Sequence, residues 1–291
     1  MLKKILFISS FTLLIANFTP ALAQKSSDIG ISPSLIEVNV EKGQTVNKQI
    51  HIINNGQLNI SVEASASQFS YVKRKSENTK LIKVDPNDWI SFSEPEFILE
   101  AGQAKTIDFQ IKIPDKVEPG GYDFLVGFNQ VNDLKENSIN IINRINTILL
   151  VNIKGDINYD AKINSFQTNK KIYYTLNPGV QFNYNLFNNS DTFILPQGEI
   201  VISNIFGKVT SKINANSETS RFLVGEEKEI LSNFTPKFLF GRYKAELNLN
   251  YANGLVVVDN CVFWVIPLRE LALLLVIIVM IFTKFKKKNK K

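Results

Sequence analysis

Several stretches of this chain alternate strictly between hydrophobic and polar residues. From Thr106 to Ile113 every second residue is isoleucine or phenylalanine, and the residues between them are polar. Residues 180–186 and 243–251 follow the same pattern. Because successive side chains of a β-strand point to opposite faces of a sheet, this period of two predicts strands with one buried and one solvent-facing side. Such strands are typical of antiparallel sheets that cover a core on one face.

Short polar segments rich in glycine and asparagine separate these predicted strands. They lie at residues 41–44, 54–56, 100–103, 119–121, 188–190, 196–198 and 253–254. Glycine and asparagine adopt the positive φ that tight turns require. Asn253-Gly254, between two predicted strands, predicts a two-residue hairpin turn of type I′. Many short strands with such punctuation, and no convincing helical period in the body of the chain, predict β-sandwich architecture.

A faint internal repeat divides the body into two halves. Residues 46–56 and 180–190 each form an alternating strand that ends in a pair of asparagines. Two sandwiches of one general type explain this repeat, and coincidence among common strand sequences is the alternative. We therefore predict an all-β fold with two immunoglobulin-like antiparallel β-sandwich domains, at residues 24–155 and 156–266, plus one C-terminal transmembrane helix.

Both ends of the chain differ from this body. Residues 1–23 carry two lysines, an apolar run and the small residues Ala21 and Ala23, as a cleavable secretory signal peptide does; an uncleaved anchor is the alternative. Residues 267–285 predict a single transmembrane helix, followed by a basic tail at 286–291. The uncharged part, residues 271–283, is too short to span a hydrocarbon core of about 30 Å, so the span must recruit the residues that flank it.

The basic tail sets the predicted orientation in the membrane. Lysines and arginines next to a span favour the cytoplasmic side, so the tail is expected in the cytoplasm and the body outside the cell. The side chains expected at the membrane interfaces are Trp264, Arg269 and Lys284. The predicted localisation is thus the cell membrane, with a single pass.

Charge and rare residues limit what the body can do. Without the signal and the segment after Ile266, the chain holds 24 basic and 26 acidic residues, so its calculated pI of 9.1 reflects the tail. A nearly neutral body gives no support for nucleic-acid binding. One cysteine, Cys261, excludes an intrachain disulfide, and one histidine, His51, is poor material for zinc sites or catalytic triads. We expect no metal and no other cofactor.

Five features are candidates for chemistry. Lys73, Arg74, Lys75 and Lys80 gather in one polar segment, where anionic wall polymers could dock; a solvated loop is the alternative that we favour. Asp85 and Asp88 could bind Ca²⁺, but a turn that leads a core Trp89 into a strand fits the spacing better. Residues 226–229 are expected to form a solvated turn rather than a catalytic carboxylate pair. His51 is expected to face solvent, and Cys261 to be a small half-buried hydrophobic residue.

Several short motifs together resemble a known family. They include Ile31-Ser-Pro33, Trp89-Ile90, Pro119-Gly-Gly-Tyr122, Asn204-Ile-Phe-Gly207, Phe240-Gly-Arg-Tyr243 and Phe263-Trp-Val-Ile-Pro267. With the predicted layout, they make the chain similar to the WxL-interacting proteins of Gram-positive surfaces and to bacterial extracytoplasmic immunoglobulin-like modules. The resemblance implies that the first domain contacts peptidoglycan and that the second binds a partner surface protein.

These observations lead to one main functional hypothesis and two alternatives. The main hypothesis is a non-catalytic, membrane-anchored bacterial cell-surface protein that binds peptidoglycan or another surface protein through its sandwiches. The first alternative is a sandwich-type envelope chaperone or assembly factor that offers an exposed strand edge. The second is an envelope carbohydrate-active enzyme that uses paired carboxylates.

Overall fold

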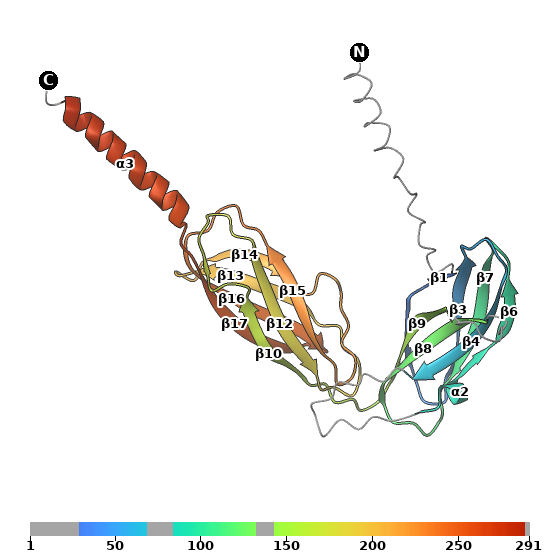
Figure 1. Ribbon diagram of the computed structural model, residues 1–291. Coiled ribbons are helices and arrows are strands. Elements are labelled where there is room, and N and C mark those ends of the chain that lie inside the picture. The colour runs from blue at the N-terminus through green and yellow to red at the C-terminus, as the bar shows by residue number, and fades with distance from the viewer. Residues whose placement is uncertain (1–28, 69–83, 132–142, 289–291) are drawn as a thin grey trace, which may run out of the picture.

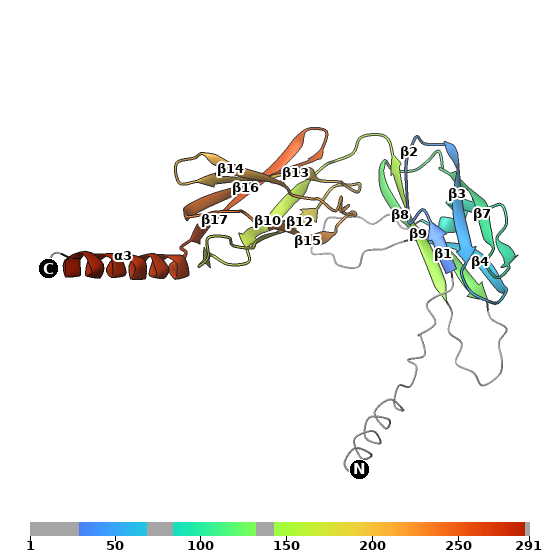
Figure 2. The ribbon, with the colours of Figure 1, turned by 90° about the horizontal axis from the view of Figure 1, so that it is seen from above.

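The protein is described by a computed structural model, which covers residues 29–68, 84–131 and 143–288, with side chains up to Thr283. The predicted signal peptide lies outside these residues. Two β-sandwiches follow one another along the chain, and a long C-terminal helix leaves the second (Figures 1 and 2).

Two sheets form the first sandwich. The four-stranded sheet has the order β1 (Ile29–Ser32), β3 (Thr45–Asn54), β7 (Ala104–Lys112), β5 (Ile90–Phe92). The five-stranded sheet has the order β2 (Leu35–Val40), β9 (Arg144–Ile153), β8 (Gly120–Val131), β4 (Ile60–Gln68), β6 (Glu96–Leu99). All pairs are antiparallel except β2 with β9, which run parallel. A one-turn helix, α2 (Pro86–Trp89), precedes β5.

The second sandwich repeats this two-sheet plan. Its three-stranded sheet has the order β10 (Ala161–Thr168), β12 (Val180–Asn188), β15 (Glu227–Phe234). Its five-stranded sheet has the order β11 (Ile172–Tyr173), β17 (Leu255–Val265), β16 (Gly241–Ala252), β13 (Gln197–Asn204), β14 (Val209–Asn214). Only β11 and β17 pair in parallel.

The predicted strands are confirmed where the alternation is strict. Residues 106–113 fall on β7 and its end, where Ile107, Phe109, Ile111 and Ile113 are buried. The turn between β16 and β17 has φ of 44° at Asn253 and 83° at Gly254. Two positive φ values in succession are the type I′ geometry, so the predicted hairpin is confirmed as well.

Aromatic side chains fill both cores. In the first sandwich the Trp89 ring lies 4.8 Å from the Tyr122 ring and 5.6 Å from the Phe124 ring, measured between centroids. In the second, Phe263 contacts Phe182 at 5.9 Å. The two groups of buried residues are separate, one in residues 29–153 and one in residues 161–265. The domain limits predicted from the sequence, 24–155 and 156–266, stay a prediction, because a domain is a piece of chain that folds by itself.

One asparagine of the internal repeat forms the same hydrogen bonds in each sandwich. Asn54 ends β3, and its Nδ2 donates to the carbonyls of Leu58, Leu99 and Glu100 at 2.8–3.1 Å. Asn188 ends β12, and its Nδ2 likewise donates to three carbonyls at 2.9–3.0 Å. Both residues are fully buried. The repeat therefore has a structural cause: one buried amide closes the same corner of each sandwich.

The helix α3 (Leu268–Lys288) begins directly after the last strand. None of the helices in the described part of the chain is long and apolar enough to cross a membrane. The transmembrane span predicted at residues 267–285 is therefore not confirmed. Along the described part of α3, large apolar side chains from Leu271 to Phe282 are exposed.

Candidate binding surfaces

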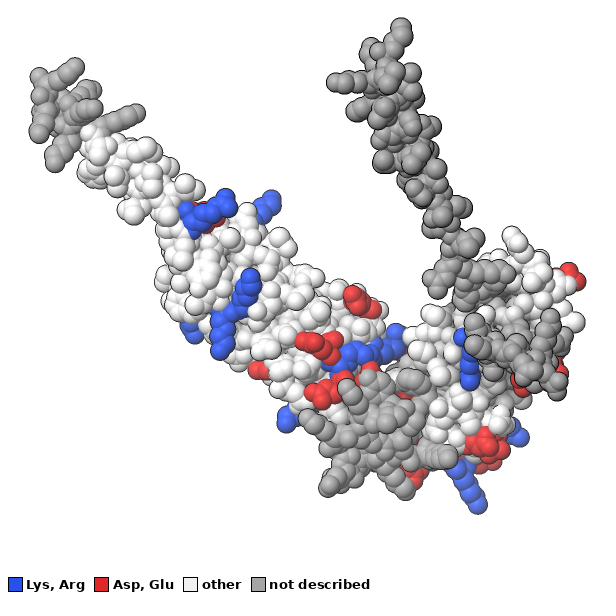
Figure 3. Space-filling model, in the orientation of Figure 1, with Lys and Arg blue, Asp and Glu red and all other residues white. Residues whose placement is uncertain are grey.

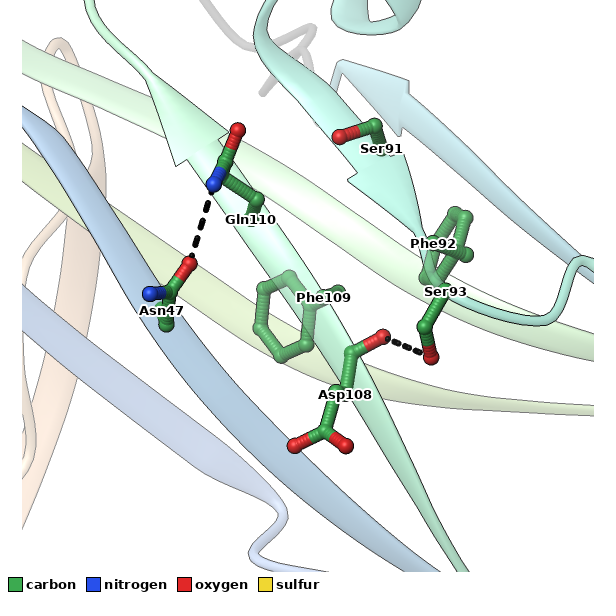
Figure 4. Close-up of a pocket in the computed structure, with 7 residues that line it drawn as sticks. All are labelled: Asn47, Ser91, Phe92, Ser93, Asp108, Phe109 and Gln110. Atoms are coloured by element: carbon green, nitrogen blue, oxygen red, sulfur yellow. Dashed lines mark hydrogen bonds between the residues drawn. The ribbon is translucent and has the colours of Figure 1, made fainter.

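A shallow hollow lies on the solvent-facing side of the four-stranded sheet, beside the short edge strand β5 (Figure 4). It is lined by Asn47, Ser91, Phe92, Ser93, Asp108, Phe109 and Gln110. The polar side chains are joined across the strands. Nε2 of Gln110 donates to Oδ1 of Asn47 at 3.1 Å, and the Ser93 hydroxyl donates to the carbonyl of Asp108 at 2.9 Å.

The chemistry of this hollow suits binding rather than catalysis. Amides, hydroxyls and one carboxylate can hydrogen-bond a polar polymer, but only Asp108 among the lining residues is an acid. Glycoside hydrolysis by the common mechanisms requires two carboxyl groups on opposite sides of the bond. In addition, the Asp108 carboxylate accepts from Nε2 of Gln49 at 2.7 Å. The hollow therefore lacks a paired acid and base.

The outer edge of β15 is a second candidate surface. Its eight residues pair with β12 in continuous register, and β12 is its only strand partner among the described residues. The other described edge strands are less suited to pairing. β1, β5, β6 and β11 have two to four residues, and the ladders of β10 and β14 each contain a register shift. The remaining edge strand, β2, has six residues and pairs with β9 in parallel. Short or bulged edges resist strand addition, so β15 is the most open antiparallel edge.

The junction between the sandwiches is polar and closely fitted. The Gly121 N–H of β8 donates to the carbonyl of Asp191 at 2.8 Å, and the Thr192 hydroxyl donates to Oδ1 of Asn152 at 3.0 Å. A Cβ at Gly121 would lie 2.9 Å from Cα of Thr192, so this contact requires glycine. Nε of Arg221 also pairs with the Glu37 carboxylate at 2.9 Å. The segment expected to be a turn at 119–121 thus also joins the two sandwiches.

The Asp123 carboxyl has a raised pKa at this junction. Its Oδ1 is buried and has no hydrogen-bond partner. Burial raises the pKa of its carboxyl to about 7, and the negative charge of Glu226 adds to the rise. Glu226 is itself buried, where it accepts from the Leu223 N–H at 2.8 Å and pairs with Lys228 at 3.0 Å. The junction therefore favours a neutral Asp123.

Replacing Asp123 with asparagine is expected to stabilise the protein at pH 8 and to have little effect near pH 4. The folded-state pKa lies above the unfolded value, so the native protein binds the extra proton and loses stability as the pH rises from about 4 to about 7. Asparagine removes that loss, which we put at roughly 2 kcal/mol after allowing for partial solvent access. Urea unfolding of both proteins at the two pH values measures it; an equal difference at both would contradict the assignment.

The other residues named from the sequence have the following places. Lys73, Arg74, Lys75 and Lys80 lie outside the described residues. His51 is exposed on β3, as predicted. Its Nδ1 lies 2.8 Å from the Thr106 hydroxyl. Cys261 is half-buried on β17, as expected, and burial raises the pKa of its thiol to about 12.

The acidic segments also have structural roles. Asp85 caps the short helix α2, because its Oδ1 accepts from the Asn87 N–H at 2.9 Å, and Trp89 follows into the core. Within the described ranges, no group of three or more His, Cys, Asp or Glu residues could hold a metal ion.

The prediction of a solvated turn at residues 226–229 was wrong: Glu226 is buried at the junction, and Glu227–Phe234 is the strand β15. Burial alternates along β15, but its sequence does not alternate between apolar and polar residues, so the hydrophobic pattern gave no clear signal for this strand.

Of the residues expected at a membrane interface, Trp264 and Arg269 are exposed where β17 gives way to α3. Lys284 lies in α3, beyond the described side chains. The structure thus brings two of the three to one end of the second sandwich, whereas the basic segment at 73–80 has no described place.

Comparison with known proteins gives only distant likenesses. No protein-family model matches the sequence, and no curated protein matches it. Among solved structures, the class 5 fimbriae chaperone CfaA is similar at a TM-score of 0.42 and 11% identity, over 80% of this chain and 98% of that chain. The Escherichia coli (E. coli) chaperone DraB has a TM-score of 0.37 and 10% identity, over 80% and 95%.

A human structure falls in the same range. The PapD-like domain 7 of CEP192 has a TM-score of 0.36 and 15% identity, over 47% of this chain and 92% of that domain. With TM-scores below 0.5, these likenesses carry no argument about the function of this chain. The resemblance to the WxL-interacting family is not confirmed by any of these comparisons and stays a prediction.

Proposed function

We propose that this chain is a non-catalytic protein of the bacterial cell envelope that binds an extended segment of another envelope protein, as a chaperone or assembly factor does. One observation carries the proposal: β15 pairs with β12 over eight residues in unbroken register, and on its outer edge it has no strand partner among the described residues. An extended peptide that adds to such an edge gains main-chain hydrogen bonds along its length.

The solvent-facing side chains of β15 indicate which partner fits. Glu227, Glu229, Leu231 and Asn233 are exposed on one face of the strand. Directly opposed side chains on neighbouring strands attract when their charges are opposite. A partner strand with a basic residue facing the glutamates and an apolar residue facing Leu231 therefore suits this edge best.

The edge is tested by position-specific photo-crosslinking in intact cells. We expect a probe at Asn233 to capture the partner, whereas a probe at Lys162 on the bulged edge β10 does not. Reversing the charge of Glu229 and replacing Leu231 with lysine should weaken binding of the recovered partner roughly tenfold, because like charges oppose one another across the ladder. The loop variant Glu218→Lys is the matched control. Equal capture at both edges would argue against strand addition at β15.

Binding of envelope polymer, such as peptidoglycan, is a second candidate. The hollow beside β5 favours it, because its amides and hydroxyls can hydrogen-bond the hydroxyls of sugars. Sedimentation with purified cell wall tests this function. Asn47→Ala with Gln110→Ala should reduce the bound fraction, whereas alanine at His51 and Thr106, a hydrogen-bonded pair on the same face, should not. Equal binding by both variants would exclude the hollow.

We also propose that α3 attaches the protein to a lipid bilayer, with the sandwiches outside the cell. The exposed apolar side chains along α3 support this placement. Cell fractionation with external protease measures it: the chain should sediment with membranes and should be cleaved in intact cells. Recovery in the soluble fraction would contradict the attachment.

A further inference from the structure

We propose that the α3 end of the second sandwich is an interaction surface for anionic lipid headgroups. The inference rests on the proposed membrane attachment and adds to it: the sandwich itself, and not only α3, contacts the bilayer. Three independent features of this end carry it, namely its aromatic side chains, the ties of its loops to the base of α3, and its charge.

All exposed aromatic side chains of the two described sandwiches lie at this one end. They are Tyr174, Phe206, Phe238, Phe240 and Trp264, which we call the aromatic rim. Phe206, at the tip of the β13–β14 turn, is 89% exposed. Large exposed apolar groups that gather in one place mark an interaction surface, whereas isolated ones do not. In the first sandwich the described large exposed hydrophobics are aliphatic.

Hydrogen bonds hold the loops of the aromatic rim around the start of α3. The Trp264 N–H donates to the carbonyl of Lys171 at 2.9 Å, and the Ile266 N–H donates to the carbonyl of Tyr173 at 2.8 Å. The Tyr243 hydroxyl accepts from the Phe240 N–H at 3.1 Å. Because Tyr243 is also in register with Asn204, the β13–β14 turn that bears Phe206 lies at the same end.

The charge of this end complements an anionic surface. Six exposed basic residues surround the aromatic rim: Lys170, Lys171, Lys208, Lys237, Arg242 and Arg269. Acids such as Asp160, Asp191 and Glu226 lie instead at the opposite end, next to the first sandwich. In Figure 3 mostly basic side chains are visible near the base of α3, where Glu270 is an acid of the first turn, whereas acidic and basic side chains lie together near the junction.

This combination selects a lipid surface over a protein partner. Tryptophan and other amphipathic aromatic side chains favour the headgroup region, and each Lys or Arg near an anionic membrane contributes to attraction. The surface is continuous with α3, whose apolar side chains are exposed from Leu271 onward. A bilayer that receives α3 therefore meets the aromatic rim next, and the rim orients the sandwich on it.

The test uses the full chain in vesicles, with Cys261→Ser and one new cysteine that carries an environment-sensitive probe. The cysteine replaces Phe206 in one protein and Glu218, an exposed residue at the far end, in the other. A headgroup-labelled quenching lipid should quench the probe at 206 and leave the probe at 218 unaffected. Vesicles of phosphatidylcholine alone and vesicles containing phosphatidylglycerol separate the apolar contribution from the charge contribution.

Neutralising Lys208, Lys237 and Arg242 to glutamine should release the aromatic rim from anionic vesicles. Each charge is expected to shift the equilibrium between docked and undocked rim about fivefold, read as the unquenched fraction. If the chain floats with the vesicles, any of three results would overturn the inference: equal quenching at 206 and 218, no quenching at 206, or no dependence on anionic lipid. Failure of the full chain to float with any vesicle would instead overturn the proposed membrane attachment.

Discussion

Replacing Asn54 with leucine should lower the free energy of unfolding by roughly 3 kcal/mol or more. The Asn54 amide is fully buried, and its Nδ2 satisfies three backbone carbonyls. Each polar group that is buried without a partner costs about 1–3 kcal/mol, and leucine can satisfy none of them. The Oδ1 of Asn54 also accepts a hydrogen bond from the Gly56 N–H at 2.9 Å, which orients the turn. Urea unfolding, followed by circular dichroism, measures the loss.

The neighbouring Asn55 provides the control for this prediction. Asn55 has the same side chain but is exposed, so Asn55→Leu should change stability by no more than about 0.5 kcal/mol. The second sandwich offers an independent repetition, because Asn188 binds three carbonyls in the same way. Equal effects at Asn54 and Asn55 would show that the buried amide is not what closes the corner.

Replacing Trp89 with alanine should cost about 3–5 kcal/mol, as truncation of a large core aromatic does. Trp89 is 4% exposed, and its ring contacts the rings of Tyr122 and Phe124. Alanine would leave a cavity that α2 cannot fill, since α2 has only one turn. The thermal midpoint of the first sandwich, followed by far-ultraviolet circular dichroism, is the measurement.

The chain's other tryptophan is the matched control. Trp264 is 43% exposed, so Trp264→Ala removes the same side chain with far less loss of buried area. We expect that variant to unfold within a few degrees of the parent protein and to differ chiefly in contact with lipid. A large loss of stability in Trp264→Ala, or none in Trp89→Ala, would contradict this description of the cores.

Local pattern was sufficient to locate the strands that have one buried and one wet face. β7, β12 and β16 alternate strictly, and each lies where the pattern predicts. The pattern failed at residues 226–229, where a run of charge hid the start of β15. Charged residues are normally solvated, but Lys228 at 3.0 Å compensates the buried carboxylate of Glu226. That compensation comes from folding, so composition could not reveal it.

The candidate surfaces were less predictable than the strands. The basic segment at Lys73–Lys75 and Lys80 drew notice by charge alone, whereas the hollow beside β5 is made of single polar residues on three different strands. Its members Asn47, Ser91 and Gln110 come together only through strand register. The open edge of β15 likewise depends on which strands neighbour it, and local sequence does not encode that order.

The sequence by itself determined the all-β character, the repeated asparagine corners and the type I′ turn, because side-chain alternation and positive φ are local properties of the chain. Only the tertiary structure decided that Gly121 joins the sandwiches and that Oδ1 of Asp123 is buried at their junction. It also decided that β15 is the open edge and that five aromatic residues far apart in sequence gather around the start of α3. These depend on sheet order and on long-range packing, which no local pattern specifies.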